Sequence, residues 1–345
     1  MPTSNAPHQN RPEHWLITGA AGFIGARMVE RCRERGIEVT SVDEPETFTS
    51  RPEHAGIDFG RTVPKDELMA WLRSGRIPRP DAVLHLGACS STTELDVEFL
   101  RRVNVEYSQE LWNHCAREGI PFVYASSAAT YGDGELGYAD DESKMEGLRP
   151  LNPYGDSKRL FDLWAIEQET QGNHPPIWSG HKFFNVYGFG ERHKGGQASV
   201  VLHAQDQIRR NGTVRLFKSH REGIRDGEQK RDFIWVGDVV DVLEFAVRHP
   251  LRRGIFNLGT GEARTFVDLA RAVFRALQAP ERIEFIPTPE AIRDRYQYFT
   301  EARMEKLRSA GYTAPFTPLE VGVARTIEAL LAFDRRRTTP TTPAT

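Results

Sequence analysis

A glycine-rich turn near the N-terminus constrains the fold of this chain more than any other feature. Residues 15–18 form a short apolar run, Gly19, Gly22 and Gly25 follow at intervals of three, and an amphipathic stretch begins at Phe23. Such glycines allow a tight turn, let the backbone approach a phosphate, and let a helix pack closely on a strand. The unpaired amide groups at the helix start then face the anion. The pattern predicts a strand, a dinucleotide-binding turn and a helix.

Apolar strands and helices continue to alternate up to about residue 187. Parallel strands joined by helices form right-handed crossovers and a sheet that is covered on both faces. We therefore predict an α/β fold, a Rossmann-type doubly wound parallel sheet with a smaller α+β substrate-binding region. The expected strands are 15–18, 37–43, 82–86, 122–125 and a fifth ending at 185, and the expected helices are 23–35, 64–73, 104–118 and 153–171, with Pro64 as the first helical residue.

The chain of 345 residues has room for about two domains. The dinucleotide-binding domain is expected at 14–187, and 238–247 and 255–258 are expected to return to the main sheet, so that about 234–260 belongs to it. Residues 188–233 and 261–334 are assigned to the substrate-binding region. Polar, proline-containing ends predict flexible tails at 1–13 and 335–345.

Composition and charge argue against several classes of protein. A net charge of −3 disfavours a dedicated nucleic-acid or anionic-membrane binder. No apolar run reaches the ~18–20 residues of a membrane span, and the polar N-terminus lacks the apolar segment of a secretory signal. The three cysteines are widely spaced, which disfavours a disulfide framework and a cysteine-based metal site. We expect a cytoplasmic protein with no metal and with no nucleic-acid or membrane partner.

Acidic residues end the second expected strand. Asp43 lies where a carboxylate accepts the ribose 2′-hydroxyl of NAD, and Glu44 follows it. Two carboxylates there repel a 2′-phosphate, which favours NAD. Lys65 would offset them if it folded over the adenosine, but a solvated lysine at a helix start is an equally good interpretation. The residues by themselves leave the choice between NAD and NADP open.

A tyrosine and a lysine share one face of the helix expected at 153–171. Tyr154 and Lys158 are four residues apart, one turn along the helix. An ammonium group in this position lowers the pKa of a phenol, so that the phenolate can accept a proton from an alcohol. Ser127 follows the fourth strand, at the edge of the sheet where ligands bind, and can hydrogen-bond the same oxygen. The set predicts redox chemistry at an alcohol.

This ordered set resembles the extended short-chain dehydrogenase/reductase family, over about residues 14–330. In that family the glycine turn binds NAD(P), and tyrosine, lysine and serine carry the redox step, typically on nucleotide-activated sugars. Several runs are similar to the branch of the family that epimerises ADP-heptose. They are G-A-C-S-S-T-T-E from 87, Y-A-S-S-A-A-T-Y-G from 124, F-N-V-Y-G from 184, H-K-G from 193, K-R-D-F from 230, F-N-L-G-T-G from 256 and R-Y-Q from 295.

The resemblance implies an ADP-heptose substrate whose C6 is inverted. C6 of a heptose is a secondary carbinol, so its oxidation gives a ketone, which turns within the pocket and is reduced again on the opposite face. Chemistry on two faces needs two acid/base groups: Tyr154 is the first, and the resemblance assigns the second to Lys194. A lysine can serve if burial lowers its pKa. The resemblance also implies bound NADP, with NAD left open, and a homo-oligomer, a pentamer.

Carried over residue by residue, the resemblance marks cofactor and substrate positions. With the glycines of the turn, the cofactor positions are Gly19, Gly22, Phe23, Ile24, Gly25, Asp43, Glu44, Lys65, Leu86, Gly87, Ala88, Cys89, Ser90, Asn104, Lys158 and Val186. The substrate positions are Asn185, Gly196, His203, Phe217, Arg231 and Tyr296. Arg231 can hold a diphosphate, and Phe217 or Tyr296 can cover adenine or sugar. For His203, a helix-face histidine without a ligand is the alternative.

The chain departs from the family at four places, one of which is that a few extra residues separate Ser127 from Tyr154. Gly196 replaces a serine, which removes one possible hydrogen bond to the substrate. The loop at 44–48 is short and lacks the lysine expected to bind a 2′-phosphate. The loop at 218–230 is longer than usual, and it either reshapes nucleotide recognition or is a plain surface insertion.

Two alternative functions are weighed against the epimerase. The first is another nucleotide-sugar epimerase or dehydratase. A dehydratase typically carries acidic residues after its Ser/Thr position, where this chain has Ala128-Ala129-Thr130, and a 4-epimerase does not need Lys194. The second is a dinucleotide sensor without activity, which would be expected to have lost Tyr154 or Lys158.

Overall fold

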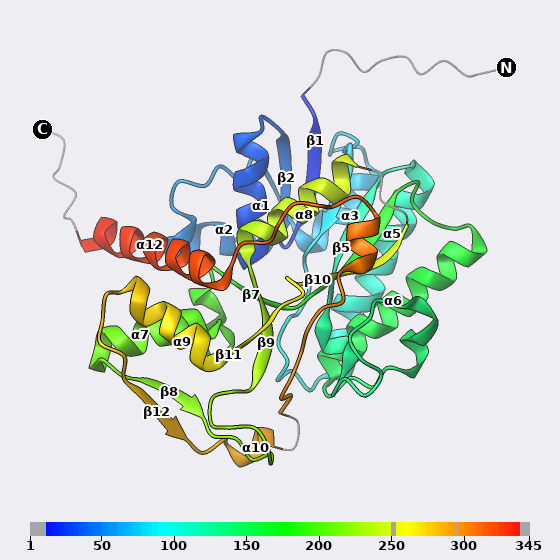
Figure 1. Cartoon of the computed structure of the whole chain (residues 1–345). Helices are drawn as coiled ribbons and strands as arrows, with labels where there is room; N and C mark the ends of the chain where they lie inside the picture. Colours follow the sequence, from blue (N-terminus) through cyan, green and yellow to red (C-terminus); the bar gives the residue numbers. More distant parts are fainter. Residues whose placement is uncertain (1–11, 250–252, 294–295, 339–345) are drawn as a thin grey trace, which may run out of the picture.

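A seven-stranded parallel sheet lies at the centre of the molecule (Figure 1). The computed structural model describes residues 12–249, 253–293 and 296–338. Most of the N-terminal tail and the end of the C-terminal tail, both expected to be flexible, lie outside these residues. The strand order is β10 (Gly254–Leu258), β6 (Trp178–Phe183), β5 (Phe122–Ser127), β4 (Ala82–His85), β1 (His14–Thr18), β2 (Glu38–Asp43) and β3 (Arg61–Pro64). The predicted fold class, a doubly wound α/β sheet, is confirmed.

Helices cover both faces of this sheet. On one face α1 (Phe23–Glu34) packs against α8 (Val236–Arg248). On the other, Trp112 of α5 (Tyr107–Glu118) contacts the ring of Phe161 in α6 (Pro153–Gln171). Shorter helical segments are α2 (Thr47–Ser50), α3 (Leu68–Arg73), α4 (Val97–Leu100), the π-helical stretch Arg101–Glu106, and 3-10 turns at Pro52–His54, Lys65–Glu67, Ala128–Tyr131, Glu142–Gly147 and Arg192–Gln197, the last labelled η6.

Local sequence explains why α6 begins and ends where it does. The side chain of Asn152 accepts a hydrogen bond from the amide of Gly155 at 2.8 Å, and Pro153 occupies the first turn. Both features are typical of helix N-termini. Gly172 ends the helix in the left-handed conformation, φ 75°. Tyr154 therefore lies in the first turn, at the carboxyl edge of the sheet.

Three predictions of secondary structure were wrong. Pro64 is not a first helical residue: it ends the edge strand β3, where a missing N–H is tolerated, and α3 begins at Leu68. Residues 238–247 lie in helix α8, because every third or fourth side chain is buried, and only the segment at 255–258 joins the sheet, in β10. The tail expected from Arg335 does not start there, since α12 continues to Thr338.

A second, smaller core stands beside the sheet (Figure 1). It packs α7 (Val200–Asn211), α9 (Phe266–Ala276) and α12 (Leu319–Thr338) against two small sheets, one of β11 (Ala263–Thr265), β9 (Lys230–Trp235) and β7 (Asn185–Tyr187), the other of β12 (Ile283–Ile286) and β8 (Val214–Phe217). Helices α10 (Glu290–Arg293) and α11 (Glu305–Ser309) lie in the connection to α12. Leu307 and Tyr312 pack into the main core, although the sequence assigned them to the substrate-binding region.

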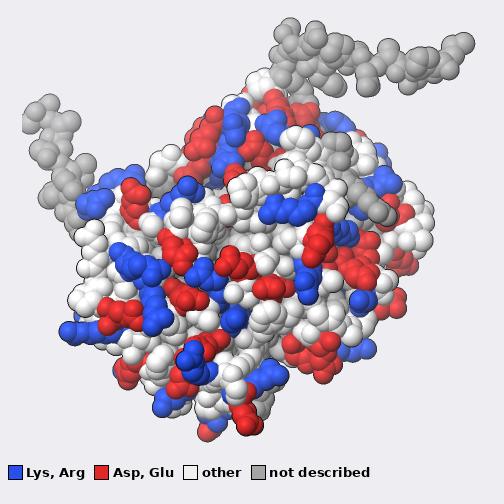
Figure 2. All heavy atoms as spheres, viewed as in Figure 1, with Lys and Arg blue, Asp and Glu red and all other residues white. Residues whose placement is uncertain are grey.

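Charged side chains of both signs alternate over the face drawn in Figure 2. This face shows no continuous basic surface of the kind that nucleic-acid-binding proteins carry. Among the described residues, no helix has the length and apolar character needed to cross a bilayer.

Candidate active site

A cavity of about 950 Å³ opens at the carboxyl edge of the main sheet. Thr18, Asp43, Leu86, Ser127 and Phe183 line it, and each stands at or just after the end of a different parallel strand. Ligands of open α/β sheets bind at this edge. The cavity therefore has the position expected for a dinucleotide and a substrate.

The three glycines of the turn are there because no side chain would fit. Gly19 has φ +65°, and a Cβ on it would lie 2.6 Å from the amide nitrogen of Gly87. Added Cβ atoms on Gly22 and Gly25 would lie 2.9 and 2.0 Å from the carbonyl oxygen of Gly19. No side chain caps α1, so its first amides stay available to a ligand. The turn forms part of the cavity wall and has the geometry that a phosphate-binding turn requires, and we refer to it as the cradle.

The acidic end of β2 holds the cradle in shape. Asp43 accepts hydrogen bonds from the amides of Ala21 and Glu44, each at 2.9 Å, and burial raises the pKa of its carboxyl group. Glu44 is paired with Lys65 at 2.5 Å. Lys65 therefore neutralises the second carboxylate rather than facing the cavity alone.

Arg51 also lines this end of the cavity, and the sequence analysis missed it. Its guanidinium donates to the carbonyl oxygen of Ala21, and burial lowers its pKa while Asp43 partly offsets the effect. In the described part of the chain no carboxylate forms an ion pair with it. The residue follows the short loop after β2 at no diagnostic spacing, so only the folded chain reveals its position.

Tyr154 and Ser127 meet at the floor of the cavity. Both line it, and a hydrogen bond from Ser127 lowers the pKa of the Tyr154 phenol against the larger opposing effect of burial. The net shift in the pKa is upward. The ammonium of Lys158 donates to the carbonyl oxygen of Ala125 at 3.0 Å, and burial lowers its pKa to about 8. The expected lowering of the phenol pKa by Lys158 is thus not found, because burial has the largest effect and the opposing, downward effect comes from Ser127.

A buried ion pair lies behind Lys158. Asp162, one helical turn further along α6, is 2.5 Å from Lys182 of β6, and both side chains are essentially inaccessible to solvent. The Asp162 carboxylate also accepts from Tyr124 at 3.0 Å and Ser126 at 2.7 Å. Because Asp162 supports the charge of Lys158, it is part of the electrostatic environment of the site. Its partners are distant in sequence, which is why no pattern predicted it.

Asn104 fixes the loop that follows β4. Its side chain accepts from the amide of Cys89 at 2.9 Å, and donates to the Cys89 carbonyl and to Ser157, both at 2.9 Å. This loop lines the cavity, and Asn104, which is buried, supports the loop without lining the cavity itself. Cys89 is among the residues that line the cavity, whereas Cys32 and Cys115 are buried elsewhere.

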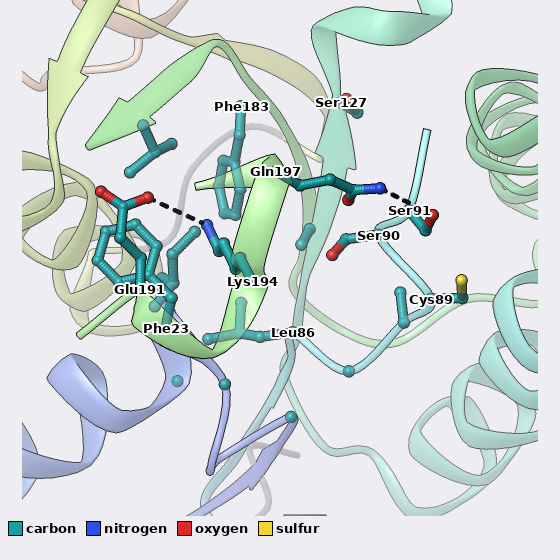
Figure 3. Close-up of a pocket in the computed structure, with 18 of the residues that line it drawn as sticks. Phe23, Leu86, Cys89, Ser90, Ser91, Ser127, Phe183, Glu191, Lys194 and Gln197 are labelled. Atoms are coloured by element: carbon teal, nitrogen blue, oxygen red, sulfur yellow. Dashed lines mark hydrogen bonds and ion pairs between the residues drawn. The ribbon is translucent and has the colours of Figure 1, made fainter. Parts of the chain in front are cut away.

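Lys194 lies across the cavity from this loop (Figure 3). Its ammonium is 4.2 Å from the centre of the Phe23 ring and 3.8 Å from the carboxylate of Glu191. Burial lowers its pKa, as a lysine that exchanges protons near neutral pH requires. Gln197, on the same segment, donates to the hydroxyls of Ser91 at 2.9 Å and Thr93 at 3.2 Å. Glu191 and Gln197 were not predicted.

The cavity brings together most of the predicted site residues, with the substrate set divided. Asn185 lines it, but Gly196, His203, Phe217, Arg231 and Tyr296 are not among the described residues that do. Phe217 and Tyr296 form an edge-to-face pair with centroids 6.0 Å apart. Arg231 stacks on Tyr296, and on Phe266, which lines the cavity. These three residues form a second cluster next to the cavity. His203 and Gly196 join neither group.

Arg231 carries a buried charge that no carboxylate of the described residues pairs with. It is 7% exposed, and its guanidinium donates to the backbone carbonyls of Lys230 and Gln297. Burial lowers its pKa, and the phenols of Tyr296 and Tyr138 offset this. Among the described residues it has no ion pair. A buried guanidinium in this state is suited to pair with an anionic group.

Comparisons with known proteins agree with this geometry. Residues 15–259 match the model of the NAD dependent epimerase/dehydratase family. An ADP-L-glycero-D-manno-heptose-6-epimerase of Fusobacterium nucleatum subsp. nucleatum is 46% identical over 92% of this chain and 98% of its own. One from Nitratidesulfovibrio vulgaris is 45% identical, with the same coverage.

Solved structures resemble the fold along nearly its whole length. The Helicobacter pylori ADP-L-glycero-D-manno-heptose-6-epimerase superposes with a TM-score of 0.78 at 24% identity, covering 93% of this chain and 97% of its own, and shows the fold alone. A UDP-glucose 4-epimerase of Thermus thermophilus in complex with NAD has a TM-score of 0.72 at 26% identity, covering 92% and 99%.

Proposed function

This chain belongs to the NAD dependent epimerase/dehydratase family, and from that premise we propose that it is an ADP-heptose 6-epimerase. It would convert ADP-D-glycero-D-manno-heptose to ADP-L-glycero-D-manno-heptose. The relatives at 45–46% identity, which match it nearly end to end, carry this name. The observation that carries the proposal is that two proton-transfer groups from separate elements, Tyr154 of α6 and Lys194 of η6, line the cavity that begins at the phosphate cradle.

The cradle suits a nicotinamide dinucleotide. The close approach of Gly19, Gly22 and Gly25 leaves no room for side chains where a pyrophosphate would lie on the first amides of α1. When bound, the dinucleotide supplies a hydride acceptor and donor that is regenerated in each cycle. Asp43, Asn104 and the loop 86–90 would hold the rest of it.

We favour NADP over NAD, with Arg51 as the residue that receives the 2′-phosphate. Lys65 is paired with Glu44, which leaves the guanidinium of Arg51 as a half-buried cation at the ribose end of the cavity. A guanidinium suits a phosphate because it can donate two parallel hydrogen bonds. Asp43 opposes this preference by charge, but its carboxylate is already engaged by two amides.

The side chains of the cavity divide the proton transfers. For Tyr154 to take the proton of the C6 hydroxyl, its phenol must first lose its own proton, against the rise that burial causes in its pKa, while Ser127 donates to the same substrate oxygen. C6 is then a ketone, and the sugar side chain turns about the C5–C6 bond to present its other face. Lys194 donates a proton to the oxygen as C6 becomes a carbinol again, now inverted. Lys158 holds positive charge beside Tyr154 throughout.

The remainder of the substrate would be anchored outside the reacting centre. Arg231 offers its unneutralised guanidinium to the diphosphate. Phe217 and Tyr296, which pack edge to face beside it, offer apolar surfaces to the adenine or the sugar. Holding the diphosphate fixed while the terminal carbons turn lets one site present both faces of C6.

We also propose, from the family resemblance, that the chain assembles into a homo-oligomer, a pentamer. Sedimentation equilibrium of the purified protein is expected to give about five times the chain mass of 39.1 kDa. A mass of one chain at micromolar concentration would rule the assembly out.

A direct test of the activity uses the purified protein with no added cofactor. It is incubated with ADP-D-glycero-D-manno-heptose and, in parallel, with UDP-glucose, and the products are analysed by NMR. The expected result is conversion of the ADP-heptose alone, and its loss in Tyr154→Phe, which should still bind the dinucleotide. Turnover of UDP-glucose at C4 instead would favour the 4-epimerase alternative.

A further inference from the structure

The backbone around Lys194 does not fix its side chain. Gly195, the next residue, has φ +53° and breaks the helical geometry of η6, and Gly196 follows. A Cβ added to either glycine would meet nothing within 4 Å. The amide of Lys194 donates to the carbonyl oxygen of Glu191 at 3.0 Å, and that of Ala198 to Gly195 at 3.1 Å, but two glycines in open space still place few steric limits on this turn. Side-chain contacts therefore contribute to the position of the ammonium.

Those contacts come from the carboxylate of Glu191 and the ring of Phe23 (Figure 3). Glu191 is only 1% exposed. Its carboxylate accepts from the amide of Ser199 at 2.8 Å and from the Ser199 hydroxyl, which tie it to the start of α7. One of its oxygens lies 3.8 Å from Nζ of Lys194. Because these hydrogen bonds hold the Glu191 carboxylate in place, it can hold the ammonium of Lys194 in place in turn.

We propose that Glu191 is a positioning residue for Lys194, holding its ammonium over the cavity and keeping it protonated until the reaction takes the proton. The inference rests on the proposed function in giving Lys194 a proton to transfer. The contact itself does not depend on it. Glu191 is buried, and among the described residues Lys194 is the cation that forms an ion pair with it. No step of the proposed mechanism uses Glu191 in any other way.

Among the charged groups near Lys194, Glu191 has the largest effect on the pKa of its ammonium. Burial lowers the pKa of Lys194, and Glu191 is the group that raises it. His193 next to it is held neutral, since burial and then the positive charges of Arg51 and Lys194 lower its pKa to about 4. Arg192 is engaged by Asp206 at 3.2 Å, and its amide donates to Glu53. The negative charge of Glu191 contributes to raising the pKa of Glu53.

The proton balance of the reaction explains why such a group is useful. In one direction Tyr154 gains the proton of the C6 hydroxyl and Lys194 loses one to the same oxygen after inversion. Each turnover ends with a phenol and a neutral amine, so before the next one the phenol must lose its proton to water and the lysine must regain one from water. A fixed carboxylate within 4 Å makes the ammonium the form to which the site returns.

The first test measures the titration of Lys194 without any substrate. Lysine amines are ¹³C-dimethylated, the signal of Lys194 is assigned by its absence in Lys194→Arg, and its pH titration is compared in wild type and Glu191→Gln. We expect the midpoint to fall by about one pH unit or more in Glu191→Gln, as for loss of an opposite charge at this range. Asp206→Asn, which removes a carboxylate from the neighbouring Arg192, is the matched control and should leave the midpoint in place.

The second test asks whether turnover uses the contact. In the pH profile of kcat/KM, only the limb that belongs to Lys194 should move to lower pH in Glu191→Gln, with the other limb unchanged. Glu191→Asp, which keeps the charge on a shorter side chain, should shift this limb less. This variant replaces Glu191→Gln in the test if Glu191→Gln does not fold. An unmoved midpoint, or an equal shift in Asp206→Asn, overturns the inference. A shifted midpoint in a protein without epimerase activity would sink the proposed function and leave the contact standing.

Discussion

Burial is the largest influence on the titratable residues of the cavity. It lowers the pKa of Lys158 and Lys194 and raises that of Tyr154, and neighbouring groups only moderate these shifts. A lysine with a pKa near neutrality can exchange protons at useful rates, but its burial costs stability. Burial of these residues therefore lowers the stability of the fold while it gives them the pKa values that the chemistry requires.

The cost of burying Lys158 is measurable. Below its folded pKa of about 8 the ammonium is charged in both states, and the folded protein bears the whole penalty; above its ordinary value of 10.5 the amine is neutral in both and the penalty is gone. The shift corresponds to about 3 kcal/mol, less about 1 kcal/mol for the hydrogen bond to Ala125. Lys158→Met should thus be inactive yet more stable, by about 2 kcal/mol at pH 7.

Urea unfolding at pH 7 and pH 9.5 checks this prediction. The advantage of Lys158→Met should shrink at pH 9.5, because the folded wild type then no longer holds a charge. Lys144→Met, at an exposed lysine paired with Asp141, should be nearly neutral at both values. Destabilisation by Lys158→Met at pH 7 would mean that the ammonium is structurally required.

Arg51 determines the choice of cofactor if our proposal is right. Arg51→Met should weaken NADP binding about tenfold or more, since a charge-assisted contact contributes about 1.5–3 kcal/mol, and should leave NAD binding nearly unchanged. Titration calorimetry with both dinucleotides measures it, with Arg73→Met as a control at an exposed arginine of α3. Equal losses for both dinucleotides would place Arg51 in the structure of the turn and not at a 2′-phosphate.

Among the elements, those with local signals could be predicted from sequence. The glycine turn, and the helix that carries Tyr154 and Lys158, depend on spacing within a few residues and were predicted at nearly the right bounds. β3 was missed because an edge strand ending in proline shows little alternation. Arg51, Asp162 and Gln197 were missed because their partners lie 20 to 106 residues away in sequence.

The segment η6 is closed over the cavity by Gln197, whose amide bridges to Ser91 and Thr93 (Figure 3). Gln197→Ala should open it more often, by a factor of about 2–10, the equivalent of one or two exposed hydrogen bonds. Native-state trypsin cleavage at Arg192 and Lys194 should speed up by that factor. Gln171→Ala, at an exposed glutamine bonded to Glu167, is the matched control. Cleavage unchanged from wild type would show that the bridge does not hold the segment.

On the scale of the whole molecule, the cavity lies where the two cores meet. One wall of the cavity, with the cradle, Tyr154 and Lys158, belongs to the main core. The other wall comes from the second core and is formed by Phe233, Phe266 and Leu269, of which Phe233 and Leu269 are buried. Arg231 in β9 bridges from this wall to the cluster next to it. The second core begins at β7, close to residue 187, where the βα alternation of the sequence ends, and the assignment of the two regions to cofactor and substrate stays a prediction. The boundary at 302–312 could not be predicted, because packing and not chain order decides it.

The central claim is that the chain inverts C6 by oxidation and reduction within one closed site. ADP-D-glycero-D-manno-heptose carrying deuterium at C6 is incubated with the protein in ordinary water, with no cofactor added, and the product is analysed by NMR. The account predicts the L-glycero epimer with deuterium retained at C6. Loss of deuterium to the solvent, or no conversion even after NADP is added to folded protein, would contradict it.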